Sequence, residues 1–171
     1  ILNTYFNKMS LSIEKDKLLH DLSFETYGFS GADLENLCNE AAIYAGKENK
    51  DSVSTIDFRQ AIDYINMGSQ LYYKLQPEEK HIVSIHESGH ALVSYLLNDS
   101  NKPTLITIIP RTKGALGFTK IIPEYEKKLY NYEDYFNQIC VLLGGRIAEK
   151  IILGKITNGA YDDIQKVNKI A

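Results

Sequence analysis

The chain alternates between segments with apolar side chains at helical spacing and short stretches rich in Gly, Pro, Ser and Asn. In the first 68 residues, apolar positions three or four apart predict helices that each bury one face. Two of these helices open with a Ser followed three residues later by an Asp, the pattern of a capping box. The predicted helices cover residues 14–26, 30–46 and 54–67. Their short loops favour antiparallel neighbours and hence a small helical bundle.

A linker is predicted at residues 69–76, and a long helix follows it. Pro77 suits the first turn of a helix, where its missing N–H costs nothing, and Glu78 and Glu79 favour the positive end of the helix dipole. The helix should extend to about Leu97. Its apolar residues cover much of its circumference, which predicts a central, largely buried helix.

β-branched residues dominate two short segments, 105–109 and 117–122, which each end at a proline and flank a turn-rich stretch. This pattern predicts a β-hairpin. An edge of the hairpin could bind an extended peptide by strand addition, or the hairpin could serve only to cover the core. The sequence leaves both possibilities open.

Helical spacing returns after the hairpin. Asn131 and Asp134 open a helix that extends to about Leu153, and Gly144-Gly145 inside it permits either close helix packing or a local break. A last helix follows residues 157–159. The predicted fold is therefore mainly α: a helical bundle over residues 1–68, then a mostly helical domain with a β-hairpin over residues 77–171.

Composition and charge narrow the possible functions. The 171 residues are 44% hydrophobic and 24% charged, with a formal net charge of −3, which is typical of a soluble domain. No basic block predicts nucleic-acid binding, and no apolar segment reaches the roughly 18 residues of a membrane helix. Cys38 and Cys140 are predicted to be buried, reduced thiols. Because the chain starts at Ile1 and stops at Ala171 inside an apparent helix, we expect a fragment of a larger protein.

The candidate chemistry lies in the long helix, in the segment His86-Glu87-Ser88-Gly89-His90. Residues four apart share one face of a helix, so both imidazoles could bind a single Zn²⁺. Glu87 would lie beside the metal and outside its ligand set, where it could take a proton from a zinc-activated water. Two histidines and a glutamate at this spacing are typical of zinc peptidases.

A catalytic zinc usually has three protein ligands, and spacing alone leaves the third open. His20 and His81 are poor candidates, because one lies in the other domain and the other is turned away from the motif. Glu149, Asp162 and Asp163 are better ones. Each also has an ordinary structural interpretation: a salt bridge for Glu149, and stabilisation of a helix N-terminus for the aspartates.

Several segments together resemble the FtsH-type, membrane-bound, ATP-dependent zinc metalloproteases, peptidase family M41. Residues 28–37 and 39–42 look like the lid of an AAA+ ATPase, and the remaining segments look like the peptidase domain, in the expected order. These are Pro77-Glu78-Glu79-Lys80, His86–His90, Ile108-Ile109-Pro110-Arg111, Gly144-Gly145-Arg146 with Ala148-Glu149, and Gly159-Ala160 with Asp162-Asp163-Ile164.

The resemblance implies roles for particular residues. The third zinc ligand of the family corresponds to Asp163, with Glu149 as the second candidate and otherwise a supporting residue. His86 and His90 would be the other ligands, and Glu87 the general base. Tyr161 is an unusual residue at its position in the motif.

The resemblance also implies a larger machine. A member of this family would use ATP and Mg²⁺ in a segment outside this chain, form a homo- or hetero-hexamer, and degrade unfolded and membrane proteins from a membrane anchor. The Asp162-Asp163 pair and the entry into the long helix look more like mitochondrial members than typical bacterial ones. The resemblance therefore implies the mitochondrial inner membrane, with the bacterial inner membrane or a plastid as alternatives. The alternative function is a catalytically silent lid and scaffold module for hexamer assembly, against which the intact Glu87 argues.

Overall fold

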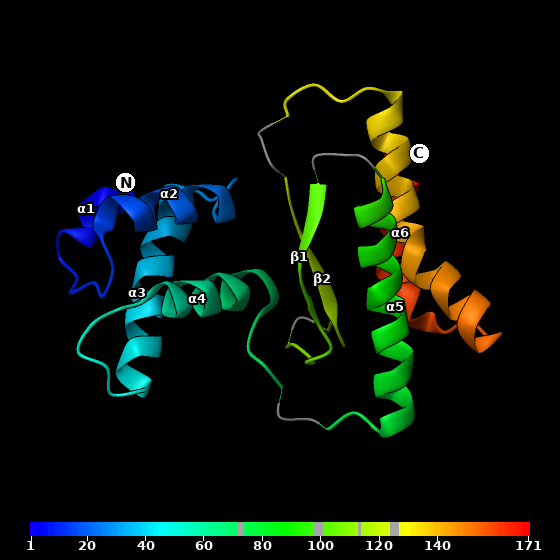
Figure 1. Cartoon of the computed structure of the whole chain (residues 1–171), viewed down its shortest axis with the longest axis horizontal. Coiled ribbons are helices and arrows are strands. Elements are labelled where there is room, and N and C mark those ends of the chain that lie inside the picture. Colours follow the sequence, from blue (N-terminus) through cyan, green and yellow to red (C-terminus); the bar gives the residue numbers. More distant parts are fainter. Residues whose placement is uncertain (72–73, 98–100, 113, 124–126) are drawn as a thin grey trace. The chain divides into compact units, whose positions relative to one another are not determined.

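The computed structural model describes residues 1–71, 74–97, 101–112, 114–123 and 127–171. Over these residues the chain forms seven α-helices, one 3-10 turn and two antiparallel strands (Figure 1). The mainly α fold predicted from the sequence is confirmed. The chain divides into two compact units, residues 1–70 and 71–171.

The first unit is a bundle of four helices around one apolar core. They are α1 (Leu2–Phe6), α2 (Lys15–Glu25), α3 (Gly31–Lys47) and α4 (Thr55–Met67). The short helix α1 was not predicted, because residues 1–12 carry no clear helical spacing. Leu18, Leu22, Leu37 and Phe58 are completely buried in the core. Phe24 on α2 is 48% exposed and lies outside this core.

Capping boxes fix the starts of two helices in this unit, as the sequence predicts. Ser30 and Asp33 form the box of α3, and Ser54 and Asp57 form that of α4. Asp57 is completely buried, and it accepts hydrogen bonds at 2.8 Å from the Lys50 Nζ and the Ser54 backbone N–H. These bonds compensate the cost of burying its charge.

The second unit places two long helices side by side with a hairpin against them. Its elements are α5 (Pro77–Leu96), β1 (Asn101–Thr107), β2 (Phe118–Pro123), α6 (Tyr132–Leu153), the 3-10 turn η1 (Asn158–Ala160) and α7 (Tyr161–Ile170). Strands β1 and β2 pair antiparallel, so the predicted hairpin is confirmed.

The first strand ends earlier than predicted. Thr107 pairs with Phe118, and the chain then leaves the sheet as the Thr107 hydroxyl accepts a hydrogen bond from the Ile109 backbone N–H. The register is also irregular between Pro103 and Leu105. Proline has no N–H to give to the ladder, which accounts for an irregularity at this point.

Helix α5 differs from its prediction on one side. Ile85, Gly89 and Ala91 are buried, whereas Leu92, Tyr95 and Leu96 near the C-terminal end are 58–67% exposed. The prediction of a helix buried around most of its circumference was therefore wrong for its C-terminal turns. Within this unit, α6 and the hairpin pack against α5 (Figure 1).

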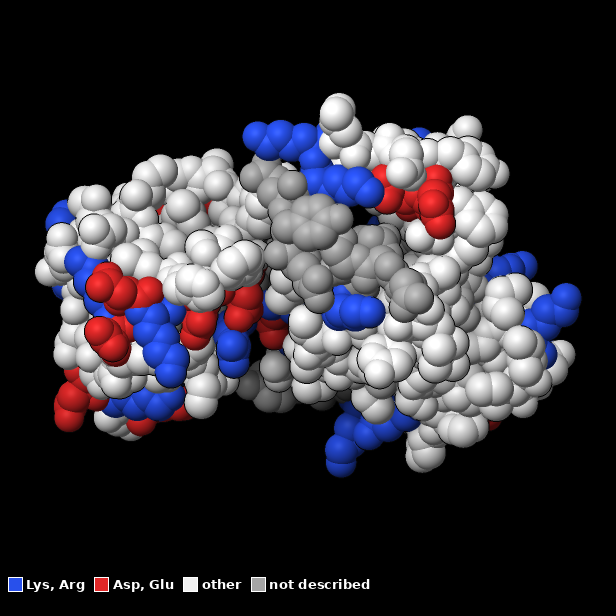
Figure 2. All heavy atoms as spheres, turned by 45° about the horizontal axis from the view of Figure 1, so that its top comes forward, with Lys and Arg blue, Asp and Glu red and all other residues white. Residues whose placement is uncertain are grey.

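Charged side chains are distributed differently on the two units. On the face drawn in Figure 2, acidic and basic side chains alternate over the first unit, whereas the second unit shows wide areas with neither. None of the helices in the described segments is long and apolar enough to cross a membrane.

Candidate metal centre

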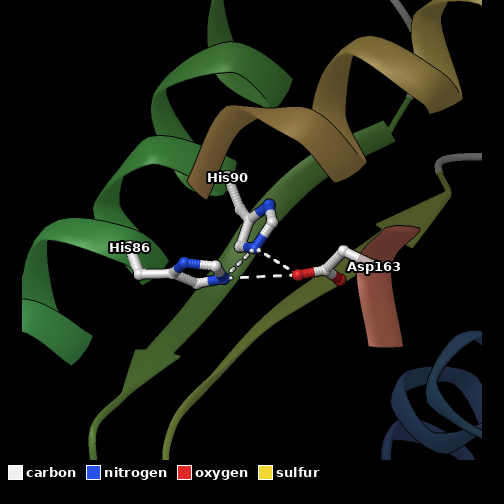
Figure 3. Close-up of side chains that lie close together, drawn as sticks. All are labelled: His86, His90 and Asp163. Atoms are coloured by element: carbon white, nitrogen blue, oxygen red, sulfur yellow. Dashed lines mark hydrogen bonds and ion pairs between the residues drawn. The ribbon is translucent and has the colours of Figure 1, made fainter. Parts of the chain in front are cut away.

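Helix α5 brings His86 and His90 together, because residues four apart lie one turn apart on the same face. The two side chains are buried, and their Nε2 atoms lie 2.9 Å apart. Figure 3 shows both imidazoles pointing from α5 toward the same point in space. The spacing of the motif thus produces a pair of convergent nitrogen atoms.

Asp163 approaches this pair from α7, 77 residues after His86. Its Oδ2 atom lies 3.3 Å from each of the two Nε2 atoms, as the dashed lines in Figure 3 show. Asp163 is half-buried, whereas its neighbour Asp162 is exposed. The first turn of α7 therefore directs Asp163, and not Asp162, toward the two histidines.

These three side chains fit a zinc ion by chemistry and by spacing. Zinc–nitrogen and zinc–carboxylate distances of about 2.0–2.1 Å imply about 3.3 Å between neighbouring ligand atoms of a tetrahedron. The observed separations are 2.9, 3.3 and 3.3 Å. Over the residues that the structure describes, no other group of His, Cys, Asp and Glu gathers in this way. Two imidazoles and one carboxylate are a set typical of catalytic zinc.

Hydrogen bonds to the far side of each ring hold the histidines in place. His86 Nδ1 donates to Glu149 Oε1 at 2.6 Å, and His90 Nδ1 donates to the Val141 backbone carbonyl at 2.7 Å. Because Nδ1 carries a proton in each ring, Nε2 is the nitrogen left to bind a metal ion, once it has lost the proton that it shares with Asp163. Such partners fix the tautomer and orientation of metal-binding histidines.

Glu149 does more than orient one ring. It is completely buried on α6, and its second oxygen, Oε2, accepts a hydrogen bond at 2.7 Å from the Thr157 backbone N–H. Thr157 in turn caps η1, the turn that leads into α7 and Asp163. One carboxylate therefore connects His86 to the segment that positions Asp163, and it lies behind the His86 ring, on the side away from Nε2.

Three glycines allow α5 and α6 to approach closely enough for these contacts. A Cβ atom on Gly89 would lie 2.4 Å from the Gly144 carbonyl oxygen, and one on Gly144 would lie 2.8 Å from the Gly89 carbonyl oxygen. Helix α6 continues through Gly144-Gly145 without interruption. Of the two interpretations of these glycines, close packing is therefore correct and a local break is not.

Gly145 gives room to the His86 imidazole itself. A Cβ atom at this position would lie 2.6–2.7 Å from three atoms of the ring, among them Nε2. We expect Gly145→Ala to displace the ring and to weaken zinc binding about 10–100-fold, the loss typical when the support of a metal ligand is disturbed. Competition titration against a chromogenic zinc chelator measures this change.

Gly46→Ala is the matched control for Gly145→Ala. Gly46 also lies inside a helix, and a Cβ atom there meets nothing within 4 Å. We expect this variant to bind zinc as the wild type does and to be slightly more stable, since Ala favours a helix over Gly. Equal zinc affinity of Gly145→Ala and Gly46→Ala would contradict the proposed role of Gly145.

Glu87 lies between the two histidines in sequence and is 7% exposed. Its Oε2 atom accepts a hydrogen bond at 2.9 Å from the Thr119 hydroxyl on β2. Burial raises the pKa of the Glu87 carboxyl above its usual range, and the Thr119 hydrogen bond partly opposes this. A carboxyl with a raised pKa is better suited to exchange a proton near neutral pH.

The pKa values of Asp163 and His86 are shifted by each other's side chains. Burial alone would raise the pKa of Asp163, but its hydrogen bonds with His86 and His90 hold that pKa far below its usual range. Burial alone would lower the pKa of His86. The nearby carboxylates of Asp163 and Glu149 have the larger combined effect and raise the pKa above its usual value. Asp163 is thus ionised, as a metal ligand must be.

A cavity of about 530 Å³ lies beside the centre, between α5, β2, α6 and α7. Its lining includes Ser94, one turn after His90, and Val141, whose carbonyl oxygen binds His90. Lys166, one turn after Asp163, lies at the same cavity. The cavity therefore lies one helical turn from His90 on α5 and one helical turn from Asp163 on α7.

The structure places the remaining candidates elsewhere. His20 and His81 are exposed; His20 belongs to the first unit, and His81 is not part of the cluster within the second. Sequence reasoning missed two supports of the site, the Thr119 hydroxyl and the Val141 carbonyl. A threonine in a strand and a backbone oxygen carry no distinctive pattern, so only the three-dimensional contacts identify them.

Comparison with known proteins matches both halves of the chain to described families. Residues 73–171 match the sequence model of peptidase family M41, and residues 16–60 match that of the AAA+ lid domain. The chain is 42% identical over 165 residues to the mitochondrial inner membrane m-AAA protease component AFG3L2 of Mus musculus, which covers 96% of this chain and 20% of that protein.

Bacterial relatives are similar to the same extent. The chain is 40% identical over 163 residues to the ATP-dependent zinc metalloprotease FtsH of Chlorobium luteolum, covering 95% of this chain and 23% of that protein. It is 41% identical over 160 residues to the FtsH of Thermotoga maritima, and the match covers 93% of this chain and 26% of that protein. The chain thus spans between a fifth and about a quarter of the length of these relatives.

Proposed function

Because the chain belongs to peptidase family M41, we propose that its second unit is the zinc-dependent peptidase part of an ATP-dependent protease. The observation that carries the proposal is the convergence of His86 Nε2, His90 Nε2 and Asp163 Oδ2, with separations of 2.9–3.3 Å. The buried Glu87 carboxylate on the same helix supplies a candidate base.

His86, His90 and Asp163 would hold the zinc ion. Bound zinc would supply Lewis acidity, lowering the pKa of a water molecule toward about 7 and polarising the peptide carbonyl. Glu149 and the Val141 carbonyl keep the two imidazoles in the correct tautomer and orientation, through hydrogen bonds of 2.6 and 2.7 Å. The family membership and the donor set both support zinc over other metals.

Glu87 acts as the general base and then as the general acid in this proposal. Its Oε1 atom takes a proton from the attacking water while Oε2 keeps its hydrogen bond to Thr119. The same carboxyl then gives the proton to the leaving amide nitrogen, and the peptide bond breaks. The raised pKa of Glu87 supports both proton transfers, because the pKa of the carboxyl is then closer to neutral pH.

The cavity beside the centre would accept a side chain of the substrate. Leu97, Ile121 and Leu142 give it an apolar lining, and Lys166 and Lys169 lie at the same cavity. Its position next to the residues around His90 and Asp163 supports a place adjacent to the cleaved bond. Unfolded polypeptides expose such apolar side chains and therefore fit this site.

We extend the proposal to the whole protein from the names of its relatives, which include an inner membrane m-AAA protease component and ATP-dependent zinc metalloproteases. Residues 1–68 would be the AAA+ lid, 69–76 a linker, and 77–171 part of the peptidase domain. ATP and Mg²⁺ would bind a segment outside this chain. The protein would act as a membrane-anchored hexamer, in the mitochondrial inner membrane or a related bacterial or plastid membrane, on unfolded and membrane proteins.

Removal and return of zinc test this function. We expect the intact protein to degrade an unfolded protein such as casein when ATP is present, to stop after treatment with 1,10-phenanthroline, and to recover when Zn²⁺ is restored. ATP hydrolysis, measured in parallel, should continue without zinc, since the two sites are separate. Undiminished casein degradation by protein shown to contain no zinc would contradict the proposal.

A further inference from the structure

The Glu87 carboxylate is held by a neighbouring strand. Among the described residues, its hydrogen-bond partner is Thr119, whose Oγ1 lies 2.9 Å from Oε2. Glu87 is 7% exposed, so water replaces this partner poorly. A buried carboxylate with one fixed oxygen has little freedom to rotate, and its other oxygen, Oε1, stays available.

The Thr119 hydroxyl is itself fixed by the helix that carries Glu87. Its Oγ1 atom lies 2.9 Å from the Glu87 backbone carbonyl as well as from the carboxylate. A hydroxyl has one proton to donate. The carbonyl of a residue inside a helix already accepts the helical N–H bond, so the proton is better used on the charged carboxylate, where hydrogen bonds are stronger.

Gly117 explains how the strand comes so close. It lies two residues before Thr119 and therefore on the same face of the chain as it enters β2. A Cβ atom on Gly117 would lie 2.7 Å from Val83 Cγ1 and 3.0 Å from Glu87 Cγ. The start of β2 thus packs directly on the Glu87 side chain, at a distance that only glycine permits. This contact brings the Thr119 hydroxyl within hydrogen-bond reach of Glu87.

We propose that Thr119 is a positioning residue for Glu87, which fixes the carboxylate through Oε2 and leaves Oε1 directed to the proton transfer. The inference rests on the proposed peptidase function and adds a residue to its machinery. Small displacements of a catalytic group reduce the rate strongly, whereas they leave substrate binding unchanged. Thr119 should therefore affect kcat and leave KM and zinc binding as they are.

The test compares Thr119→Val with Thr119→Ser in the intact protein. Valine keeps the branched shape and favours a strand, but it lacks the hydroxyl, whereas serine keeps the hydroxyl. We expect Thr119→Val to lower kcat for a fluorogenic peptide about tenfold, with KM unchanged, the effect of losing one hydrogen bond to a charged group. Thr119→Ser should restore most of the wild-type kcat.

Two further measurements separate positioning from a general structural effect. Zinc content should be the same in Thr119→Val and in the wild type, and a crystal structure of the valine variant should show the Glu87 carboxylate rotated. Thr104→Val is the matched control, because Thr104 also bonds a carbonyl, that of Lys120, within the same hairpin, and has no contact with Glu87 among the described residues.

The outcomes distinguish this inference from the function on which it rests. An active wild type, an inactive Glu87→Gln and a fully active Thr119→Val overturn the positioning role alone. Equal losses in Thr119→Val and Thr119→Ser also overturn it, since the hydroxyl would then be irrelevant. Full activity of Glu87→Gln overturns the proposed function itself.

Discussion

Replacing Glu87 with Gln is expected to abolish peptide hydrolysis while leaving the metal in place. The amide has nearly the shape of the carboxylate, and its oxygen can still accept the hydrogen bond that Thr119 donates to Oε2. It cannot take a proton from water, and loss of a general base typically lowers rates by about 10²–10⁴-fold. Casein degradation by the intact protein and zinc content by mass spectrometry measure the two effects.

Ser88→Ala is the control for this substitution. Ser88 is the next residue along α5, but its side chain is exposed. We expect this variant to keep both zinc and activity. Turnover by Glu87→Gln within a few-fold of that by Ser88→Ala would contradict the assignment of Glu87 as base and would favour the catalytically silent scaffold or another proton acceptor. Loss of zinc in Glu87→Gln would instead indicate that Glu87 belongs to the ligand set.

The half of the site that lies on one helix could be predicted from the sequence. Helical geometry alone places His86 and His90 on one face, and their Nε2 atoms are indeed 2.9 Å apart. The start of α5 at Pro77 and the capping box of α6 at Asn131 were also predictable, because these signals act within a few residues. Interactions between residues close together in the chain can therefore be recognised from the sequence.

The contribution from other elements could not be predicted in this way. Spacing alone left Glu149, Asp162 and Asp163 open, since nothing in a linear pattern says which carboxylate returns to a helix some 60–80 residues earlier. The resemblance to the family selected Asp163, and the structure brings that side chain to the histidines while Asp162 is exposed. Which face a turn presents depends on packing of α7, a tertiary property.

The limits of the prediction for α5 have the same origin. Apolar residues around a helix predict burial only if enough neighbouring surface exists to cover them. In the second unit, α6 and the hairpin cover the face that carries the motif, and Leu92, Tyr95 and Leu96 stay 58–67% exposed. Gly144 likewise had two interpretations, and the structure favours helix packing, because a Cβ atom on Gly144 would lie only 2.8 Å from the Gly89 carbonyl oxygen.

Removing the Asp163 carboxylate should abolish tight zinc binding, because it takes away one of the three proposed ligand atoms. We expect Asp163→Ala to lose more affinity than the roughly 10–100-fold typical for loss of an outer hydrogen-bond partner. Glu149→Gln should fall within that range, since Glu149 supports His86 through Nδ1. Zinc should therefore raise the melting temperature of Glu149→Gln and leave that of Asp163→Ala unchanged, because only a bound ligand stabilises the folded state.

Asp162→Ala provides the matched control, because it removes the same side chain and the same charge one residue away, at an exposed position. It should bind zinc as the wild type does. If Asp163→Ala and Asp162→Ala bind zinc equally well while Glu149→Gln does not, the third ligand is Glu149 and the geometry around His86 must change on metal binding. If only Asp163→Ala fails, the carboxylate of α7 completes the centre. The proposed centre then depends on the segment from Thr157 to Asp163, because the helix carrying His86 and His90 supplies only two ligands by itself.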